Sequence, residues 1–125
     1  MTTPPMLRQM RHDVWATGKL LEHCQSLTAE GMQLTASVDE IASRLARVRD
    51  AVEQLFKSKE LDFDRRIRDE RRKADLELWV PLAQFSHHGS DHRSQIGTIL
   101  TVAGLAVPEL DVWAYATDRG AFARL

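Results

Sequence analysis

Apolar residues recur along the first part of the chain at intervals of three, four and seven, the spacing that places them on one face of an α-helix. In the segment from about Pro5 to Leu27 they are Leu7, Met10, Val14, Leu21 and Cys24. Pro4 and Pro5 suit the first turn of a helix, where the missing backbone N–H leaves no hydrogen bond unmade. The pattern therefore predicts an amphipathic helix over residues 5–27.

A second helix is predicted after a short break. The residues Ser37-Val38-Asp39-Glu40 have the spacing of a capping box, which marks the first turn of a helix. The stripe that follows consists of Ile41, Leu45, Val48, Val52 and Leu55/Phe56. From Lys57 to Glu77 the periodicity disappears, and basic and acidic residues alternate almost one for one. This pattern predicts a solvated connector, and no part of the chain predicts a strand.

The third long helix is predicted to begin near Leu78 or Pro81 and to run to Ala103. Its stripe consists of Leu82/Phe85, His88, His92, Gln95/Ile96 and Ile99. Gly104 is expected to end it, with Leu105 as an apolar cap contact. Pro108 is then expected in the first turn of a short closing helix, ELDVWAYATDR, which Gly120 ends. The sequence thus predicts one all-α domain over 1–125, an up-and-down bundle of three long helices and a short C-terminal helix.

Charge and composition narrow the classes of partner. The net charge of −1 provides no long-range field to attract nucleic acid or an anionic membrane. The basic run from Arg65 to Lys73 is interleaved with acids and lacks an aromatic cluster, so it does not favour nucleic-acid binding. The N-terminal segment has no apolar run that would indicate a signal peptide or membrane anchor. The single cysteine, Cys24, cannot form an intrachain disulfide and is typical of the reducing cytoplasm, where we expect this protein to be located.

The candidate chemistry lies in the third helix, where His87, His88 and His92 occur close together. His88 and His92 are four residues apart, a spacing that lets two imidazoles on one helical face reach the same cation. Because Phe85, Ile96 and Ile99 fall on or beside that face, we expect both imidazoles to point inward toward a shared cavity. His87 lies about 100° away around the helix and is interpreted as a polar neighbour. Core histidines satisfied by backbone, carboxylate or water are the alternative interpretation.

The segment His87-His88-Gly89-Ser90-Asp91-His92-Arg93-Ser94-Gln95 resembles the histidine motif in the last long helix of the DinB/YfiT-like family of helical-bundle proteins. The apolar run from Ile96 to Leu100 follows it, as in that family, and then come Gly104, Pro108, Asp111, Trp113 and Tyr115. The first predicted helix, with HDVWATGKLLEHC, is also similar to the family's first helix. Together these segments cover about half of the chain.

The resemblance implies that His88 and His92 bind a divalent metal, Zn²⁺ or Ni²⁺, with a third histidine supplied by the family's second helix. Such a metal activates a water or a thiol, so the resemblance implies a metal-dependent hydrolase or thiol transferase acting on a small molecule. No histidine lies between Met32 and Leu82 in this chain. In one alignment Arg44 takes the place of the third histidine. In the alignment we prefer, the helix that carries it is missing.

Several sources of a third ligand remain open at this point, namely His12, His23, Asp91 and a partner chain. Arg93 and Gln95 are expected to hydrogen-bond across helices rather than to take part in chemistry. A non-catalytic bundle that acts in assembly or in small-ligand binding is the second functional hypothesis. Because three helices cannot enclose all of the predicted apolar stripes, we also expect an obligate homodimer with a large apolar interface.

Overall fold

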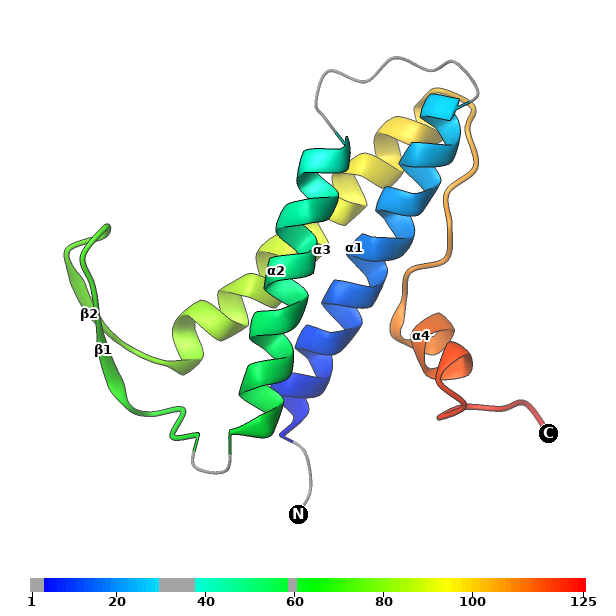
Figure 1. Ribbon diagram of the computed structural model, residues 1–125. Helices are drawn as coiled ribbons and strands as arrows, with labels where there is room; N and C mark the ends of the chain where they lie inside the picture. The colour runs from blue at the N-terminus through cyan, green and yellow to red at the C-terminus, as the bar shows by residue number, and fades with distance from the viewer. Residues whose placement is uncertain (1–3, 30–37, 59–60) are drawn as a thin grey trace.

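The computed structural model describes residues 4–29, 38–58 and 61–125 (Figure 1). Its elements follow in the order α1 (Pro5–Ala29), α2 (Val38–Lys57), β1 (Arg66–Asp69), β2 (Ala74–Glu77), α3 (Trp79–Val102) and α4 (Val112–Asp118). The predicted three long helices and short terminal helix are confirmed. In this described part of the chain, no helix is both long and apolar enough to cross a membrane.

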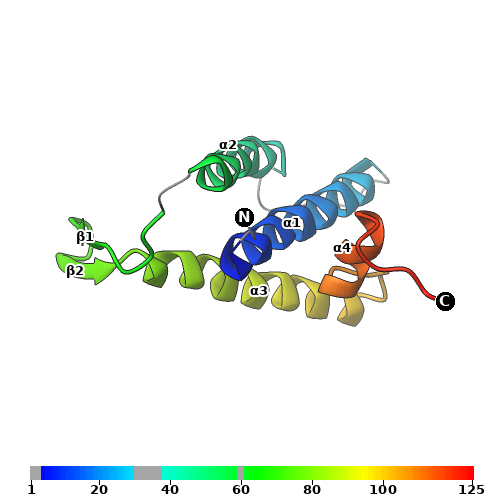
Figure 2. The ribbon, with the colours of Figure 1, turned by 90° about the horizontal axis from the view of Figure 1, so that it is seen from below.

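Helix α1 is the central element, lying between α2 and α3 (Figure 2) and contacting α2, α3 and α4. Most of the buried apolar side chains belong to it: Leu7, Met10, Val14, Ala16, Leu20 and Leu27. They extend around the helix because neighbouring elements pack on more than one of its sides. The predicted stripe is correct up to Val14, after which Leu20 and Leu27 are buried and Leu21 and Cys24 are only half-buried.

Two apolar clusters hold the helices together. One joins Leu7, Met10 and Val14 of α1 to Val52 of α2, and the other joins Leu20 and Leu27 of α1 to Leu100 of α3. Burying each of these side chains contributes about 1.5–3 kcal/mol. The predicted α2 stripe packs against the first cluster from Leu45 to Phe56, whereas Ile41 is 40% exposed. Ser37 of the predicted capping box lies outside the described residues.

The prediction that the connector contains no strand is wrong. Strands β1 and β2 pair antiparallel, with Ile67 opposite Leu76 and Asp69 opposite Ala74. The turn is closed by Asp69, whose carboxylate accepts from the backbone N–H of Arg72 at 3.0 Å. Lys73 takes a positive φ of 51°, a conformation usually given to glycine or asparagine. Because the turn contains neither residue, the sequence lacks the usual signal of a hairpin.

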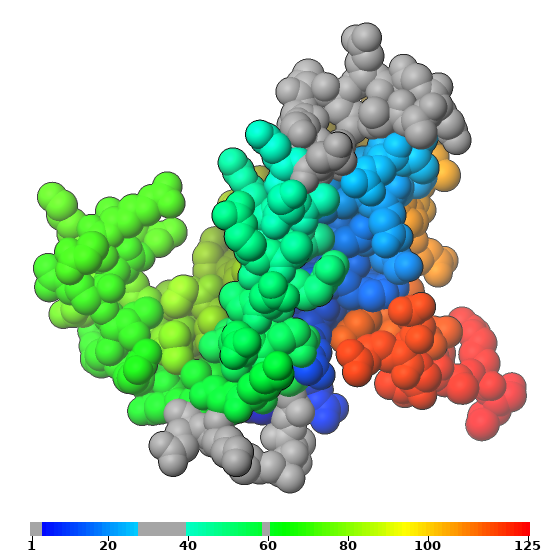
Figure 3. All heavy atoms as spheres, viewed as in Figure 1, coloured from blue at the N-terminus to red at the C-terminus, as the bar shows by residue number. Residues whose placement is uncertain are grey.

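The hairpin is tied to the start of α3 by backbone hydrogen bonds. The N–H of Leu78 donates to the carbonyl of Arg65 at 2.9 Å, and that of Trp79 donates to Phe63 at 3.0 Å. In the space-filling view the hairpin stands away from α2, and part of α3 is visible between them (Figure 3). One flank of α3 is therefore bordered by the hairpin.

The C-terminal end of α3 is built as predicted. Gly104 has a φ of +74°, and the N–H of Leu105 donates to the carbonyl of Leu100 at 2.9 Å, which satisfies a terminal carbonyl of the helix. Leu105 also packs on the second apolar cluster. The sequence therefore identifies both the residue that ends α3 and its apolar cap contact.

The segment after α3 runs back along α1, where two histidines hold it. Nε2 of His23 lies 2.7 Å from the carbonyl oxygen of Ala106, and Nε2 of His12 lies 2.7 Å from that of Leu110. Pro108 lies in this segment and not in a helical turn, which corrects the prediction for the closing helix. That helix begins only at Val112, because the carboxylate of Asp111 accepts from the N–H of Ala114 at 2.8 Å and caps it.

Candidate metal centre

His88 and His92 lie one turn apart on α3, and their imidazoles meet. Their Nε2 atoms are 2.9 Å apart, and the ring centroids are separated by 4.3 Å. Two ligands bound to one ion at 2.0–2.1 Å are about 2.9–3.4 Å apart for the angles found in octahedral and tetrahedral sites. The separation of the two nitrogens therefore suits a pair of ligands to one cation.

Gln95 fixes the orientation of His92. Its Oε1 lies 3.2 Å from Nδ1 of His92, and because a carbonyl oxygen only accepts, Nδ1 carries the proton. The lone pair of the neutral ring is then on Nε2, which accepts a hydrogen bond from the Nε2–H of His88 at 2.9 Å. A metal ion bound between the two rings would replace this proton. Metal-binding histidines commonly donate the N–H of the ring nitrogen that does not bind the metal in this way, which sets both the tautomer and the ring direction. Gln95 bonds along its own helix, so the prediction that it bonds across helices is wrong.

The two imidazoles do not point into the core. Both side chains are exposed, as are four other residues of the same flank of α3, and we call these six residues the histidine face: Pro81, Gln84, His88, His92, Ile96 and Ile99. The predicted inward orientation is therefore wrong. A different side of α3 packs against α1, and we call it the inner face: Leu82, Ser86, Arg93 and Leu100.

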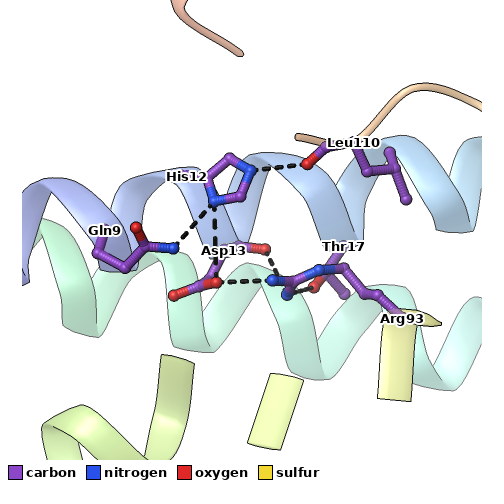
Figure 4. Close-up of polar contacts among 6 residues, drawn as sticks. All are labelled: Gln9, His12, Asp13, Thr17, Arg93 and Leu110. Atoms are coloured by element: carbon purple, nitrogen blue, oxygen red, sulfur yellow. Dashed lines mark hydrogen bonds and ion pairs between the residues drawn. The ribbon is translucent and has the colours of Figure 1, made fainter. Parts of the chain in front are cut away.

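A charge pair determines which side of α3 faces α1. Nη2 of Arg93 donates to Oδ1 of Asp13 at 2.6 Å, and Nη1 donates to Oγ1 of Thr17 at 3.2 Å (Figure 4). The Asp13 side chain is only 2% exposed and that of Arg93 10%. Turning the histidine face toward α1 would leave Asp13 buried without its cation, which is strongly unfavourable. Arg93 therefore bonds across helices, as the sequence predicted.

His12 extends this polar network on α1. Its Nε2 donates to the carbonyl of Leu110, so its Nδ1 can accept from the side-chain amide of Gln9 at 3.1 Å (Figure 4). His12 and Asp13 are both buried, at 7% and 2% exposure. Sequence reasoning did not identify Asp13. Its position beside Val14 of the apolar stripe, together with Arg93 two helical turns before Leu100 on the same side of α3, is the signal that could have found the pair.

The other candidate ligands are engaged elsewhere. Both nitrogens of His12 are used, His23 bonds to Ala106, and His87 pairs with Asp91 at 3.4 Å. Burial raises the pKa of the Cys24 thiol, which disfavours the thiolate that metals bind. Within the described ranges, no group of three histidine, cysteine or acidic side chains is placed to hold one ion. Among the described residues, one chain therefore supplies two ligands to the ion, His88 and His92.

A pocket of about 500 Å³ adjoins His88. The first turns of α3 line one wall with Val80, Pro81 and Phe85, and the hairpin lines another with Leu76. Asp69 and Arg72 also reach this pocket, where the Arg72 guanidinium donates to the Asp69 carboxylate at 2.7 Å. This side-chain hydrogen bond, followed by that of the Arg72 backbone, lowers the pKa of the Asp69 carboxyl. The lining is mainly apolar.

Comparisons with known proteins found no matching family model, no similar curated protein and no similar solved structure.

Proposed function

We propose that this chain is a DinB-like protein that holds a divalent metal ion through His88 and His92. The observation that carries the proposal is the 2.9 Å separation of the two Nε2 atoms, with Gln95 orienting His92 through Nδ1. When bound, Zn²⁺ or Ni²⁺ supplies Lewis-acid activation of a water or a thiol, which suits a hydrolase or a thiol transferase. The resemblance of the histidine segment to the DinB/YfiT-like motif supports this class.

A single chain is expected to bind the ion weakly. Catalytic zinc sites usually have three protein ligands, and His88 and His92 provide two. Both imidazoles are also exposed, so water competes for the ion and the ligands are not held rigidly by packing. We therefore expect a labile site, whose other coordination positions remain open to a substrate or a further ligand.

Elemental analysis of the native protein, followed by calorimetric titration with Zn²⁺ and Ni²⁺, tests this proposal. We expect His88→Ala and His92→Ala each to abolish measurable binding, because one imidazole is left. His87→Ala is the matched control, since His87 is an exposed histidine of the same helix that pairs with Asp91 instead. Stoichiometric binding that survives both site substitutions would show that other residues hold the metal.

The second candidate is a non-catalytic protein that uses the bundle for assembly. It is supported by the exposure of Ile96 and Ile99, at 38% and 67%, beside the two histidines. An exposed apolar surface of this kind is typical of an interaction site. A native protein that contains no metal and binds neither ion in titration, yet self-associates, would favour this candidate over the metalloenzyme.

A further inference from the structure

The histidine face has a spacing that suits pairing with a second copy of itself. Its members lie within about a third of the helix circumference, given 100° per residue. They are also placed symmetrically about position 90, at 81 and 99, 84 and 96, and 88 and 92. In an antiparallel pair of α3 helices with its two-fold axis at position 90, every residue of this face would meet another residue of the same face.

The pairs produced by this arrangement contain no opposed like charges. Pro81 would meet the partner's Ile99, Gln84 would meet the partner's Ile96, and His88 would meet the partner's His92. The only acid near the axis, Asp91, would lie opposite Gly89 of the partner and not opposite another acid. No pair in this register therefore places like formal charges together at its centre.

The pocket beside His88 is complementary to the exposed isoleucines. Pro81 and Ile99 are each nine residues from position 90, about 13 Å along the helix axis. In the pocket wall, Pro81 thus lies as far from the axis on one side as Ile99 does on the other. An antiparallel partner would bring its Ile96 and Ile99 to this mainly apolar pocket, which would cover the isoleucines and the pocket together.

The metal site is incomplete in one chain, and the same arrangement would complete it. We propose that two chains pair antiparallel through their histidine faces, so that His88 and His92 of both chains form one four-imidazole site for a divalent cation such as Zn²⁺. Four nitrogen ligands satisfy the tetrahedral coordination that zinc prefers in proteins. The metal part of this inference rests on the proposed function, whereas the helix pairing stands on the spacing and the pocket.

Because the ion would bind only the paired site fully, metal binding and pairing are thermodynamically coupled. Zinc is therefore expected to lower the dissociation constant of the dimer, and pairing is expected to raise the affinity of the site for zinc. Sedimentation equilibrium of the full chain, with a chelator and then with Zn²⁺, measures the first effect. We expect at least about a tenfold fall in the dimer dissociation constant, with one ion bound per two chains. A monomer in both conditions, or one ion bound per monomeric chain, would overturn the pairing.

A pair of introduced opposite charges tests the register without using the metal. We expect Gln84→Lys and Ile96→Glu each to weaken the dimer, and the double variant to recover at least about tenfold of the loss. The introduced charges face each other only across the two chains, since positions 84 and 96 are about 18 Å apart along one helix. Val112→Glu is the matched control, because Val112 is 51% exposed but lies on α4. A double variant no stronger than the weaker single variant would refute this register.

The two tests separate the two proposals. The variant with both His88→Ala and His92→Ala is expected to lose the zinc effect but still to form a dimer in chelator, because Ile96, Ile99 and the pocket are unchanged. If the double variant Gln84→Lys with Ile96→Glu recovers dimerisation but the wild type binds no zinc, the proposed function is refuted and the pairing is retained. A chain that binds zinc and remains monomeric with zinc bound would retain the proposed function and refute the pairing.

Discussion

On the inner face of α3, Leu82, Arg93 and Leu100 pack against α1, whereas Ile96 and Ile99 on the histidine face are 38% and 67% exposed. Both faces belong to one helix and both contain apolar residues with polar ones between them. On the inner face the polar residue is a cation bound to a buried carboxylate, Asp13, at 2.6 Å. On the histidine face the polar residues are two exposed imidazoles that meet each other.

This difference shows how a helix with two apolar faces selects the one that is buried. Apolar area alone distinguishes weakly between the two faces, because each contains leucine or isoleucine. The Asp13–Arg93 pair favours burial of the inner face strongly, since removing one partner from a buried pair leaves a charge without compensation. The histidine face then remains accessible to a ligand or a partner. Imidazoles suit such a position because they tolerate water and still bind metal ions.

Breaking the charge pair is expected to have the largest effect. Arg93→Ala should lower the free energy of unfolding by about 3–5 kcal/mol, because Asp13 is left buried without its cation. Urea denaturation followed by circular dichroism measures the change. The double variant Asp13→Asn with Arg93→Met should recover part of the loss, since no charge is then buried. An effect of Arg93→Ala below about 1 kcal/mol would show that the pair does not fix the packing of α3.

Two adjacent residues allow the faces to be compared directly. Leu100 is 6% exposed on the inner face, and Ile99 is 67% exposed on the histidine face. Leu100→Ala should cost about 2–5 kcal/mol of unfolding free energy, because it leaves a cavity in the cluster with Leu20 and Leu27. Ile99→Ala should change it by less than about 0.5 kcal/mol. Both measurements need protein concentrations at which the chain is monomeric, and equal effects would contradict the assignment of the two faces.

The histidine face is tested through the residue that orients His92. Gln95→Leu should weaken Zn²⁺ binding by about 10–100-fold. The Nδ1 proton of His92 then has no acceptor at position 95, and the ring is no longer held in one direction. Calorimetric titration gives the affinity. Gln25→Leu, the same change at an exposed position of α1, is the control and should leave binding unaltered. If both variants bind zinc as the wild type does, Gln95 has no part in the site.

The helices were predictable because their signals are local. Pro5 at the start of α1 and Gly104 after α3 act through backbone geometry that depends on few neighbours. The inner face of α3 was not predictable in this way, because the choice depends on Asp13, a residue 80 positions away from Arg93. The sequence could place His88 and His92 on one side of a helix, but it could not show which side α1 covers.

The hairpin was missed for a different reason. Its strands are four residues long and rich in charge, and each has one large apolar residue, Ile67 or Leu76, so the alternation that predicts a strand is too short to recognise. Its turn depends on the Asp69 carboxylate and on a lysine with positive φ. Such a turn becomes recognisable only from the hydrogen bonds that it forms.

The smallest expected effect concerns this turn, which forms one wall of the pocket beside His88. The Arg72 hydrogen bonds lower the folded-state pKa of Asp69 below its unfolded value. The stabilisation is therefore fully present above the unfolded pKa and is lost as the pH falls through the lowered, folded-state pKa.

Carbon-13 titration of the Asp69 carboxyl should show the lowered pKa in the wild type and a higher one in Arg72→Ala. In Arg71→Ala the pKa should stay low, because Arg71 contributes only through its backbone. Asp69→Asn should speed hydrogen exchange at the Arg72 amide without changing exchange within α1, since the hairpin packs apart from the main clusters. An Asp69 pKa that does not respond to Arg72→Ala would show that the turn, and with it this wall of the pocket, is held by other contacts.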